Sequence, residues 1–219
     1  MRNGAFITWH RYSQISCRTD VPALKIALWI CLCIAASGAH ADPRADARAD
    51  VQHALDQVLA AGGFRGYAQG RVFGPEMPSM AGEIDVILPD RIHASTDSLE
   101  FITIGDRAWI STLGVWAAVD RSLVPVTAFD VGAMRKAIAS IHDAIFEGTA
   151  KTQQCPARVY RFRANGNLPG ASANGDLRAW ICDVSGRPAR IEAIDGRTRE
   201  RVTFDFDWAR RPDVRPPAR

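Results

Sequence analysis

The stretch LPDRIHASTDSLEFITIGDRAWISTLGVWAAVD, residues 88–120, consists of short apolar runs that are separated by turn residues. The interruptions fall at Pro89-Asp90, at Gly105-Asp106 and at Gly114. Short runs at this regular spacing predict antiparallel strands that are joined by tight turns. We therefore expect a meander of strands here, with Ile92 and Ala94 pointing inward.

Similar strand patterns flank this meander on both sides. The segment before it carries Ile84, Val86 and Leu88 at alternate positions. Alternation of this kind predicts a strand with one buried face. The strands expected outside the meander cover residues 64–74, 81–90, 157–163, 176–183, 188–195 and 199–208.

Two segments have helical periodicity instead. Residues 45–61 place Val51, Leu55 and Val58 on one face. Residues 130–146 repeat apolar side chains every three or four positions, with Asp130 as the expected N-cap and Gly148 as the expected stop. The fold class that follows is α+β: an antiparallel sheet of about 10 to 11 strands, curled around two or more helices.

The N-terminus has the three parts of a secretory signal peptide. A region with four basic residues precedes an apolar run, residues 26–36, and Ala39 and Ala41 form an A-x-A cleavage pattern. A spanning helix needs about 20 apolar residues, and this run is shorter. We therefore predict cleavage after Ala41 and export to the periplasm, without stable membrane insertion.

Two alternatives concern the same region. Val21 is a possible true start, because the segment before the apolar run is long for a signal. A lipoprotein signal would use Cys31 or Cys33, but the bulky residues Ile30 and Leu32 precede them. The expected divisions are thus a signal peptide at 1–41, one domain at 42–208, and a disordered basic tail at 209–219 that is rich in proline and arginine.

The charge balance argues against nucleic acid as a partner. Removing the signal's four basic residues and one acidic residue from the chain's 27 and 24 leaves 23 of each. Nucleic-acid-binding domains usually carry a basic excess, which is missing here.

Two cysteines remain after cleavage, Cys155 and Cys182, and an even number in an exported protein favours a disulfide. Buried free thiols and a catalytic thiol are the alternatives. A register that sets Cys155 opposite Cys182 also sets Tyr160 opposite Leu177. Apolar side chains then share one face, and Arg161 lies on the other with the cysteines. Such a bridge contributes about 3 to 4 kcal/mol in the loop-entropy description.

The chain resembles the LolA-like superfamily, which includes periplasmic lipoprotein carriers, lipid-binding lipoproteins and RseB-type sensor domains. The resemblance lies in residues 88–120, in CPARVYRF and in LRAWICDVSGRPARIEAIDG. It implies an unclosed half β-barrel whose concave face holds acyl chains beneath helices. It also implies a role in binding or moving lipids, lipoproteins or another apolar ligand.

A half-closed sheet exposes more inner apolar surface than two helices cover, which is the form that a ligand cavity takes. Met134, Ile138 and Ile141 are expected to cover the cavity. The residues expected to line it are Ile84, Val86, Leu88, Ile92, Phe101, Trp109, Trp116, Tyr160, Phe162, Phe204 and Phe206.

Catalytic and metal-binding patterns are missing from the sequence. The histidines His53, His93 and His142 form no zinc motif, and Asp205 and Asp207 are more typical of a solvated strand face than of a cation site. We therefore expect no enzyme activity, no metal and no cofactor. The expected function is a monomeric periplasmic carrier or binder of lipid or lipidated protein. The alternative is a sensory module of the same fold that binds an inner-membrane partner protein.

Overall fold

The chain is described by a computed structural model. The described residues are 43–72, 79–97, 99–124, 129–168, 171–173, 175–195 and 200–217. The signal peptide and its cleavage site therefore lie outside the described part of the chain.

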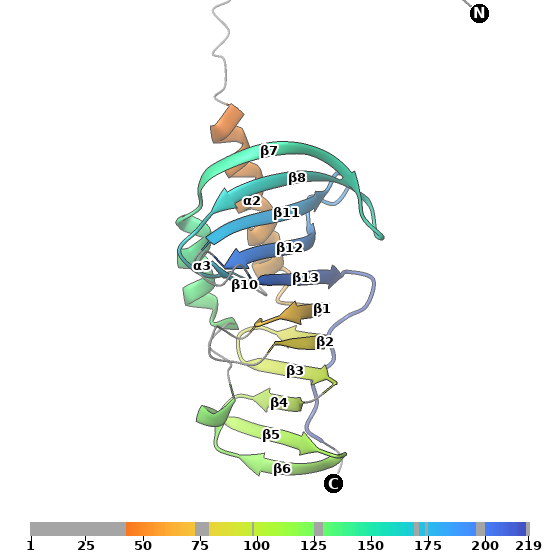
Figure 1. Cartoon of the computed structure of the whole chain (residues 1–219). Helices are drawn as coiled ribbons and strands as arrows, with labels where there is room; N and C mark the ends of the chain where they lie inside the picture. The colour runs from red at the N-terminus through yellow and green to blue at the C-terminus, as the bar shows by residue number, and fades with distance from the viewer. Residues whose placement is uncertain are drawn as a thin grey trace, which may run out of the picture. The chain divides into compact units, whose positions relative to one another are not determined.

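The strands form a single curled antiparallel sheet with a small hairpin beside it (Figure 1). The sheet has eleven strands in the order β6-β5-β4-β3-β2-β1-β13-β12-β11-β8-β7, and β9 pairs with β10. The order is linear, so the sheet is unclosed, with β6 and β7 at its edges. The strands are β1 (Gly63–Gly70), β2 (Met80–Ile87), β3 (Arg91–Thr96), β4 (Glu100–Ile104), β5 (Arg107–Thr112), β6 (Val115–Val119), β7 (His142–Lys151), β8 (Pro156–Arg163), β9 (Gly166–Leu168), β10 (Ala171–Ala173), β11 (Gly175–Cys182), β12 (Pro188–Asp195) and β13 (Arg201–Asp207).

The first helix, α2 (Pro43–Ala60), lies close to the span that the sequence predicts. Its buried residues Val51, Leu55 and Val58 recur at helical spacing and belong to the same hydrophobic cluster as the sheet. The helix ends before Gly62, whose φ of +69° is costly for other residues. This glycine lets the chain reverse directly into β1.

The second helix is shorter than the sequence predicts. It covers Val131–Ala139 (α3), and β7 begins at His142. Asp130 is the N-cap, because its side chain accepts a hydrogen bond from the backbone N–H of Ala133 at 2.6 Å. The expected stop, Gly148, lies within β7 at a φ of +133°. The helical spacing of apolar residues predicted over 130–146 therefore covers two elements, the helix α3 and the start of the strand β7.

The segment from 165 to 175, which we expected to be a plain loop, contains β9 and β10. Leu168 of β9 is fully buried in the main hydrophobic cluster. The flanking strands β8 and β11 pair with Cys182 opposite Ala157, not opposite Cys155. The predicted register is thus wrong by two residues. A shift of two preserves the faces, and Tyr160, Phe162 and Leu177 are buried as predicted.

Cys155 and Cys182 still form a disulfide, with their Cα atoms 5.7 Å apart. Cys155 lies just before β8, in the turn that follows β7. In that turn, the side-chain amide of Gln154 donates a hydrogen bond to the backbone carbonyl of Phe206. The turn is therefore held to both β11 and β13.

Residues 209–217 differ from the disordered tail that the composition predicts. Val214 is only 4% exposed and packs with Ile102 and Trp109. Arg210 pairs with Asp207 at 2.6 Å and lies 3.7 Å from Glu83. The apolar contact of Val214 and the ion pair of Arg210 with Glu83 thus both join this segment to the sheet.

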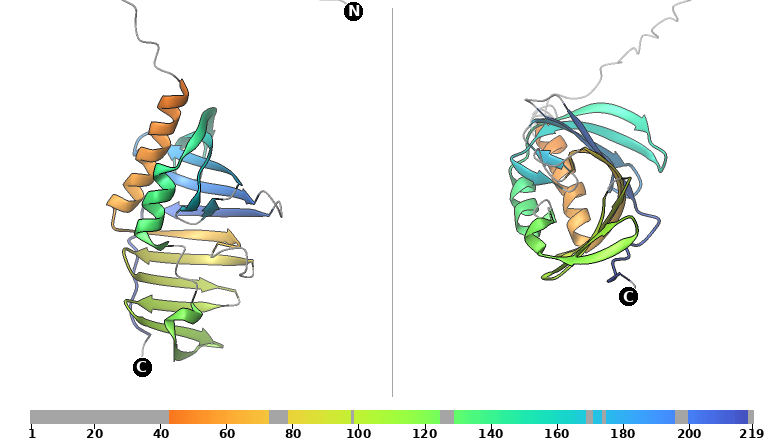
Figure 2. Two further views of the ribbon diagram at one scale, coloured as in Figure 1. Left: turned by 90° about the vertical axis from the view of Figure 1, so that its left-hand side faces the viewer. Right: turned by 60° about the horizontal axis from the view of Figure 1, so that its bottom comes forward.

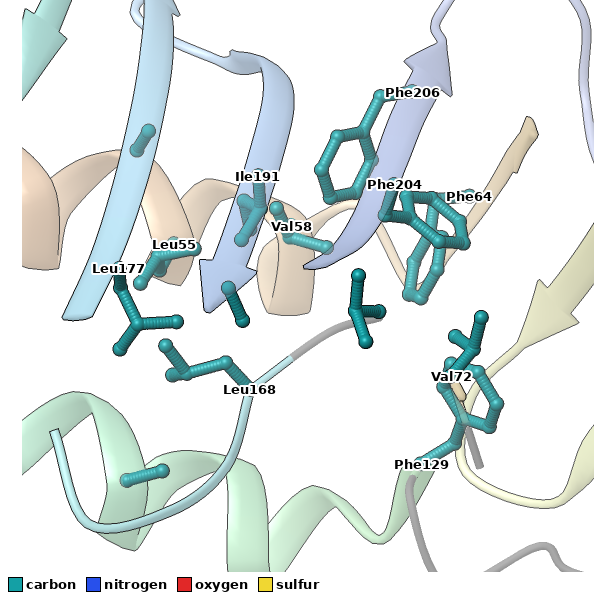
Figure 3. Close-up of a cluster of buried hydrophobic side chains, with 14 of the residues drawn as sticks. Leu55, Val58, Phe64, Val72, Phe129, Leu168, Leu177, Ile191, Phe204 and Phe206 are labelled. Carbon is teal, nitrogen blue, oxygen red and sulfur yellow. The ribbon is translucent and has the colours of Figure 1, made fainter. Parts of the chain in front are cut away.

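The core lies between the sheet and α2. Phe64, Phe204 and Phe206 pack ring against ring, with centroid distances of 4.8 to 5.6 Å (Figure 3). Leu55 and Val58 approach from α2, and Leu168 from β9, in the same view.

Candidate functional site: the concave apolar face

The strand register separates two apolar faces. Phe101 is paired with Ile110, and both belong to the main cluster that includes α2. Their neighbours Ile102 and Trp109 are also paired, and they belong to a second cluster. Adjacent residues of a strand point to opposite sides. We call the side that α2 contacts the concave face and the other side the convex face.

Most of the predicted lining residues do meet on the concave face. Leu88 packs at its margin, and Met134 is fully buried on α3. The predicted residues that belong to the main cluster are Ile84, Val86, Ile92, Phe101, Ile138, Ile141, Tyr160, Phe162, Phe204 and Phe206.

Trp109 and Trp116 lie elsewhere, on the convex face with Ile102 and Val214. The inward positions of β5 are Ala108 and Ile110. Every residue from Ala108 to Ile110 is apolar, so alternation alone does not show which side faces inward, and the prediction that Trp109 and Trp116 line the cavity was wrong. The guanidinium of Arg107 lies 4.7 Å from the Trp109 ring centroid.

Sequence reasoning missed several residues of the same cluster. Phe64 was available as the first inward position of a predicted strand. Val72 also lay within the predicted strand 64–74, in phase with Phe64. Phe129 and Leu168 lie outside the predicted strands and helices, where no periodicity indicates their burial.

The concave face has two halves that differ in their cover. In the described part of the chain, α2 packs chiefly against β7, β8, β11, β12 and β1, and α3 packs chiefly against β9. Among the described residues, the backbones of both helices lie farther from β3–β6 (Figures 1 and 2). Ile92, Ala94 and Phe101 of that second half are nevertheless at most 3% exposed.

Thr103 is a buried polar residue of this second half. It pairs with Ile92 and Ala108, so its side chain faces the concave side. The residue is fully buried, and its Oγ1 has no hydrogen-bond partner among the residues that the structure describes. Leaving a buried hydroxyl unpaired costs about 1 to 3 kcal/mol.

Polar contacts fix α2 over the first half. Asp50 Oδ2 accepts hydrogen bonds from Tyr160 Oη at 2.5 Å and from Arg158 Nη1 at 2.7 Å. Burial and the bond to Asp50 raise the pKa of Tyr160 to about 12. The Tyr160 hydroxyl therefore remains a proton donor at every physiological pH.

A second set of bonds joins α2 to α3, and α3 to β9. Gln52 Nε2 donates to the carbonyl of Ile138 at 3.0 Å, and Arg48 Nη2 donates to that of Ala139 at 3.2 Å. Ser140 Oγ accepts from the backbone N–H of Asn165 at 2.8 Å. We call α3, β9 and β10 together the lid.

The convex face carries charged groups in pairs. Arg190 binds Asp205 through two nitrogens, at 2.5 and 2.9 Å, and the Asp85 carboxylate lies 3.3 Å from Arg65. Burial raises the pKa of Asp85 despite this partner.

The three histidines that we considered as metal ligands have different surroundings. His93 bonds to Glu100 at 3.1 Å, whereas His53 and His142 are exposed. The described residues include no group of three or more histidine, cysteine or carboxylate side chains that could hold a metal ion. Among the described helices, none has the length and apolarity needed to cross a bilayer.

No protein-family model matches the chain, and no curated protein matches it in sequence. In structure the chain is similar to LprF from Mycobacterium bovis, with a TM-score of 0.54 and 12% identity over 81% of this chain and 100% of that one. It is similar also to the lipoprotein LppX from Mycobacterium tuberculosis, with a TM-score of 0.51 and 12% identity over 76% and 95% of the two chains. A weaker likeness is to MucB, with a TM-score of 0.46 and 15% identity over 82% and 64%. The chain thus has the LolA-like fold that its sequence predicts.

Proposed function

We propose that the chain is an exported carrier or binding protein for an apolar ligand, either a lipid or the acyl chains of a lipoprotein. The ligand would lie on the concave face along β3–β6, where neither helix supplies the main cover. The observation that carries this proposal is Thr103, whose buried hydroxyl faces that surface and has no hydrogen-bond partner within the described ranges. An ester or carboxyl oxygen of a lipid would supply the missing acceptor.

The proposed ligand contacts follow from the cluster. Ile92 and Phe101 lie beside Thr103, and Ile84 and Val86 continue the surface toward β1. Each buried methylene contributes about 0.8 kcal/mol, so an acyl chain gains affinity in proportion to the length that it buries. Phe204, Phe206 and Phe162 belong to the half beneath α2. Because Ile92, Ala94 and Phe101 are at most 3% exposed, a ligand reaches the β3–β6 half only when the lid moves.

Export to the periplasm is part of the same proposal. The disulfide supports it, because such bonds persist in oxidising compartments. We propose no catalytic role and no cofactor.

The first test is native mass spectrometry of the protein purified without detergent. A carrier is expected to show an adduct of acyl-chain mass that organic extraction removes. A bare protein that also fails to bind added methyl palmitate would contradict the proposal.

Thr103→Val sharpens that test because valine keeps the shape and removes the hydroxyl. We expect this variant to bind methyl palmitate about 5- to 10-fold more weakly, the effect of one hydrogen bond, and to bind hexadecane unchanged. The unliganded variant should be at least as stable as the parent protein, since an unpaired hydroxyl is removed. Equal losses for both ligands would assign Thr103 to packing alone.

A second candidate function is a sensory module that binds a membrane-associated partner protein. The packing of the half beneath α2 favours it, because Phe204, Phe162 and Leu177 are fully buried by the protein's own side chains. A bare mass with no binding of added lipid, together with capture of a protein partner, would select this alternative.

A further inference from the structure

The edge strand β6 lacks the features that normally prevent edge strands from pairing. Its sequence, VWAAV, contains no charge and no proline, and it pairs with β5 without a bulge. Val115 is 72% exposed. The opposite edge strand, β7, has charged residues and two register shifts, which discourage further pairing.

The turn before β6 shows which backbone groups face the open edge. Leu113 and Gly114 have φ values of 52° and 79°, as in the type I′ turn of a two-residue hairpin. In such a hairpin the flanking residues, Thr112 and Val115, form a hydrogen-bonded pair, and bonded pairs alternate along the ladder. Val115, Ala117 and Val119 therefore bond to β5. The N–H and C=O groups of Trp116 and Ala118 point away from the sheet.

We propose that β6 pairs in antiparallel fashion with β6 of a second copy of this chain, about a two-fold axis at Ala117. In this register Trp116 lies opposite Ala118 of the second copy, and Ala118 lies opposite Trp116 of the second copy. These are the residues whose backbone groups point outward, so both pairs form complete hydrogen-bonded pairs. Ala117 then lies opposite Ala117 of the second copy, in a pair that shares no hydrogen bonds. In such pairs the Cα atoms approach to about 4.5 Å, so a small side chain fits.

The side chains agree with the same register. Val115 lies opposite Val119, and each Trp116 lies beside an alanine, so every contact joins apolar groups. Asp120 falls opposite Gly114, so no like charges face each other across the axis. A two-fold contact is closed, since each copy uses its one β6 edge, and it would produce a dimer and not a fibre.

This dimer departs from the monomer that we expected from the sequence, where strand order is not visible. It would also join the concave faces of two copies edge to edge, because Ala117 and Val119 lie on the same side of the sheet as Ile110 and Ala108. The inference does not depend on the proposed ligand.

Cysteine cross-linking tests the register directly. Ala117→Cys is expected to form covalent dimers under mild oxidation. In the proposed register, residue 117 is the position that lies opposite the same residue of the second copy, at a distance that suits a disulfide. Val115→Cys is the matched control and should not cross-link to itself, although it should cross-link in a mixture with Val119→Cys. Equal cross-linking by Ala117→Cys and Val115→Cys would overturn the proposed axis.

Light scattering tests the association itself. The protein should have the mass of a dimer, and Ala117→Lys should weaken association at least tenfold, because two lysines meet at the axis. Mixing this variant with Ala117→Glu should restore dimers. Val184→Lys, which adds the same charge at a residue that is 94% exposed in a distant turn, should dimerise normally. A monomeric mass for the parent protein, or a dimer that Ala117→Lys leaves intact, would refute the proposal.

Discussion

Asp50 is the residue that joins helix α2 to the sheet through charge. It lies on the exposed margin of the helix and receives the Tyr160 hydroxyl and the Arg158 guanidinium on one oxygen. The ring of Tyr160 is buried beneath it, with only 2% of the residue exposed. The hydroxyl therefore reaches a charged acceptor from an apolar site, where a hydrogen bond to a charge is worth about 1.5 to 3 kcal/mol.

Tyr160→Phe should lower the free energy of unfolding by about 1.5 to 3 kcal/mol at neutral pH. The pKa of Tyr160 is raised from 10.0 to about 12, so the stabilisation is fully present below pH 10 and is lost as pH rises toward 12. Urea unfolding at a series of pH values measures this difference between the two proteins. Tyr67→Phe, at a residue that is 47% exposed, is the control and should change stability little. A difference that persists unchanged at pH 12 would contradict the assigned bond.

At this scale, alternation predicts a residue's face only where polar and apolar residues alternate. β13 meets that condition, and its Phe204 and Phe206 were placed correctly. β5 does not, and Trp109 was placed on the wrong face. The burial of the Thr103 hydroxyl without a partner among the described residues was not predictable, because it is known only after its neighbours are placed.

At the scale of elements, the turn between β7 and β8 is held by the disulfide from Cys155 to Cys182. The double variant Cys155→Ala, Cys182→Ala should lose about 3 to 4 kcal/mol of unfolding free energy, since the closed loop no longer limits the unfolded chain. Urea unfolding with and without a reductant provides the measurement. The reduced parent protein should match the variant, and the variant should not respond to reductant. A parent protein that is insensitive to reduction would show that the bridge adds no stability.

The lid is the element that the sequence predicted least well. The apolar spacing from Val131 to Ile145 suggested one helix, but Ser140 ends it and bonds to the backbone of Asn165 instead. The same contact brings β9 beneath α3, so a segment that looked like a loop contributes Leu168 to the core. Such contacts join residues far apart in the chain, and local periodicity does not report them.

Leu168→Ala weakens the packing of the lid against the main hydrophobic cluster. Removing a fully buried leucine should cost about 2 to 5 kcal/mol of stability. If the ligand requires an open lid, weakening the closed state should also raise the apparent affinity for methyl palmitate at least about threefold. Leu177→Ala removes the same atoms from β11 and should lose stability without a gain in affinity. A gain in both variants, measured by titration calorimetry, would assign the effect to general loosening of the core.

At the scale of the whole molecule, the unclosed sheet curls around α2, and α3 of the lid is hydrogen-bonded to α2 through Gln52 and Arg48. The fold class was predictable because most strands carry their own turn signals. The division of the concave face into two halves was not, since it depends on which strands α2 contacts. That division suggests that ligand entry moves the lid and leaves the sheet in place.

Hydrogen exchange with mass-spectrometric readout tests whether the lid moves on ligand binding while the sheet stays in place. Adding methyl palmitate should increase exchange at Asn165 and in β9, because the backbone N–H of Asn165 loses its bond to Ser140 Oγ when the lid moves. The amides of β3 and β4 should become more protected beneath the bound chain, and those of β13 should not change. Thr103→Val should reduce these changes at the same lipid concentration, because less ligand is bound. Increased exchange throughout the sheet would mean that the lipid acts as a detergent, whereas protection of the lid would mean that the ligand binds with the lid closed.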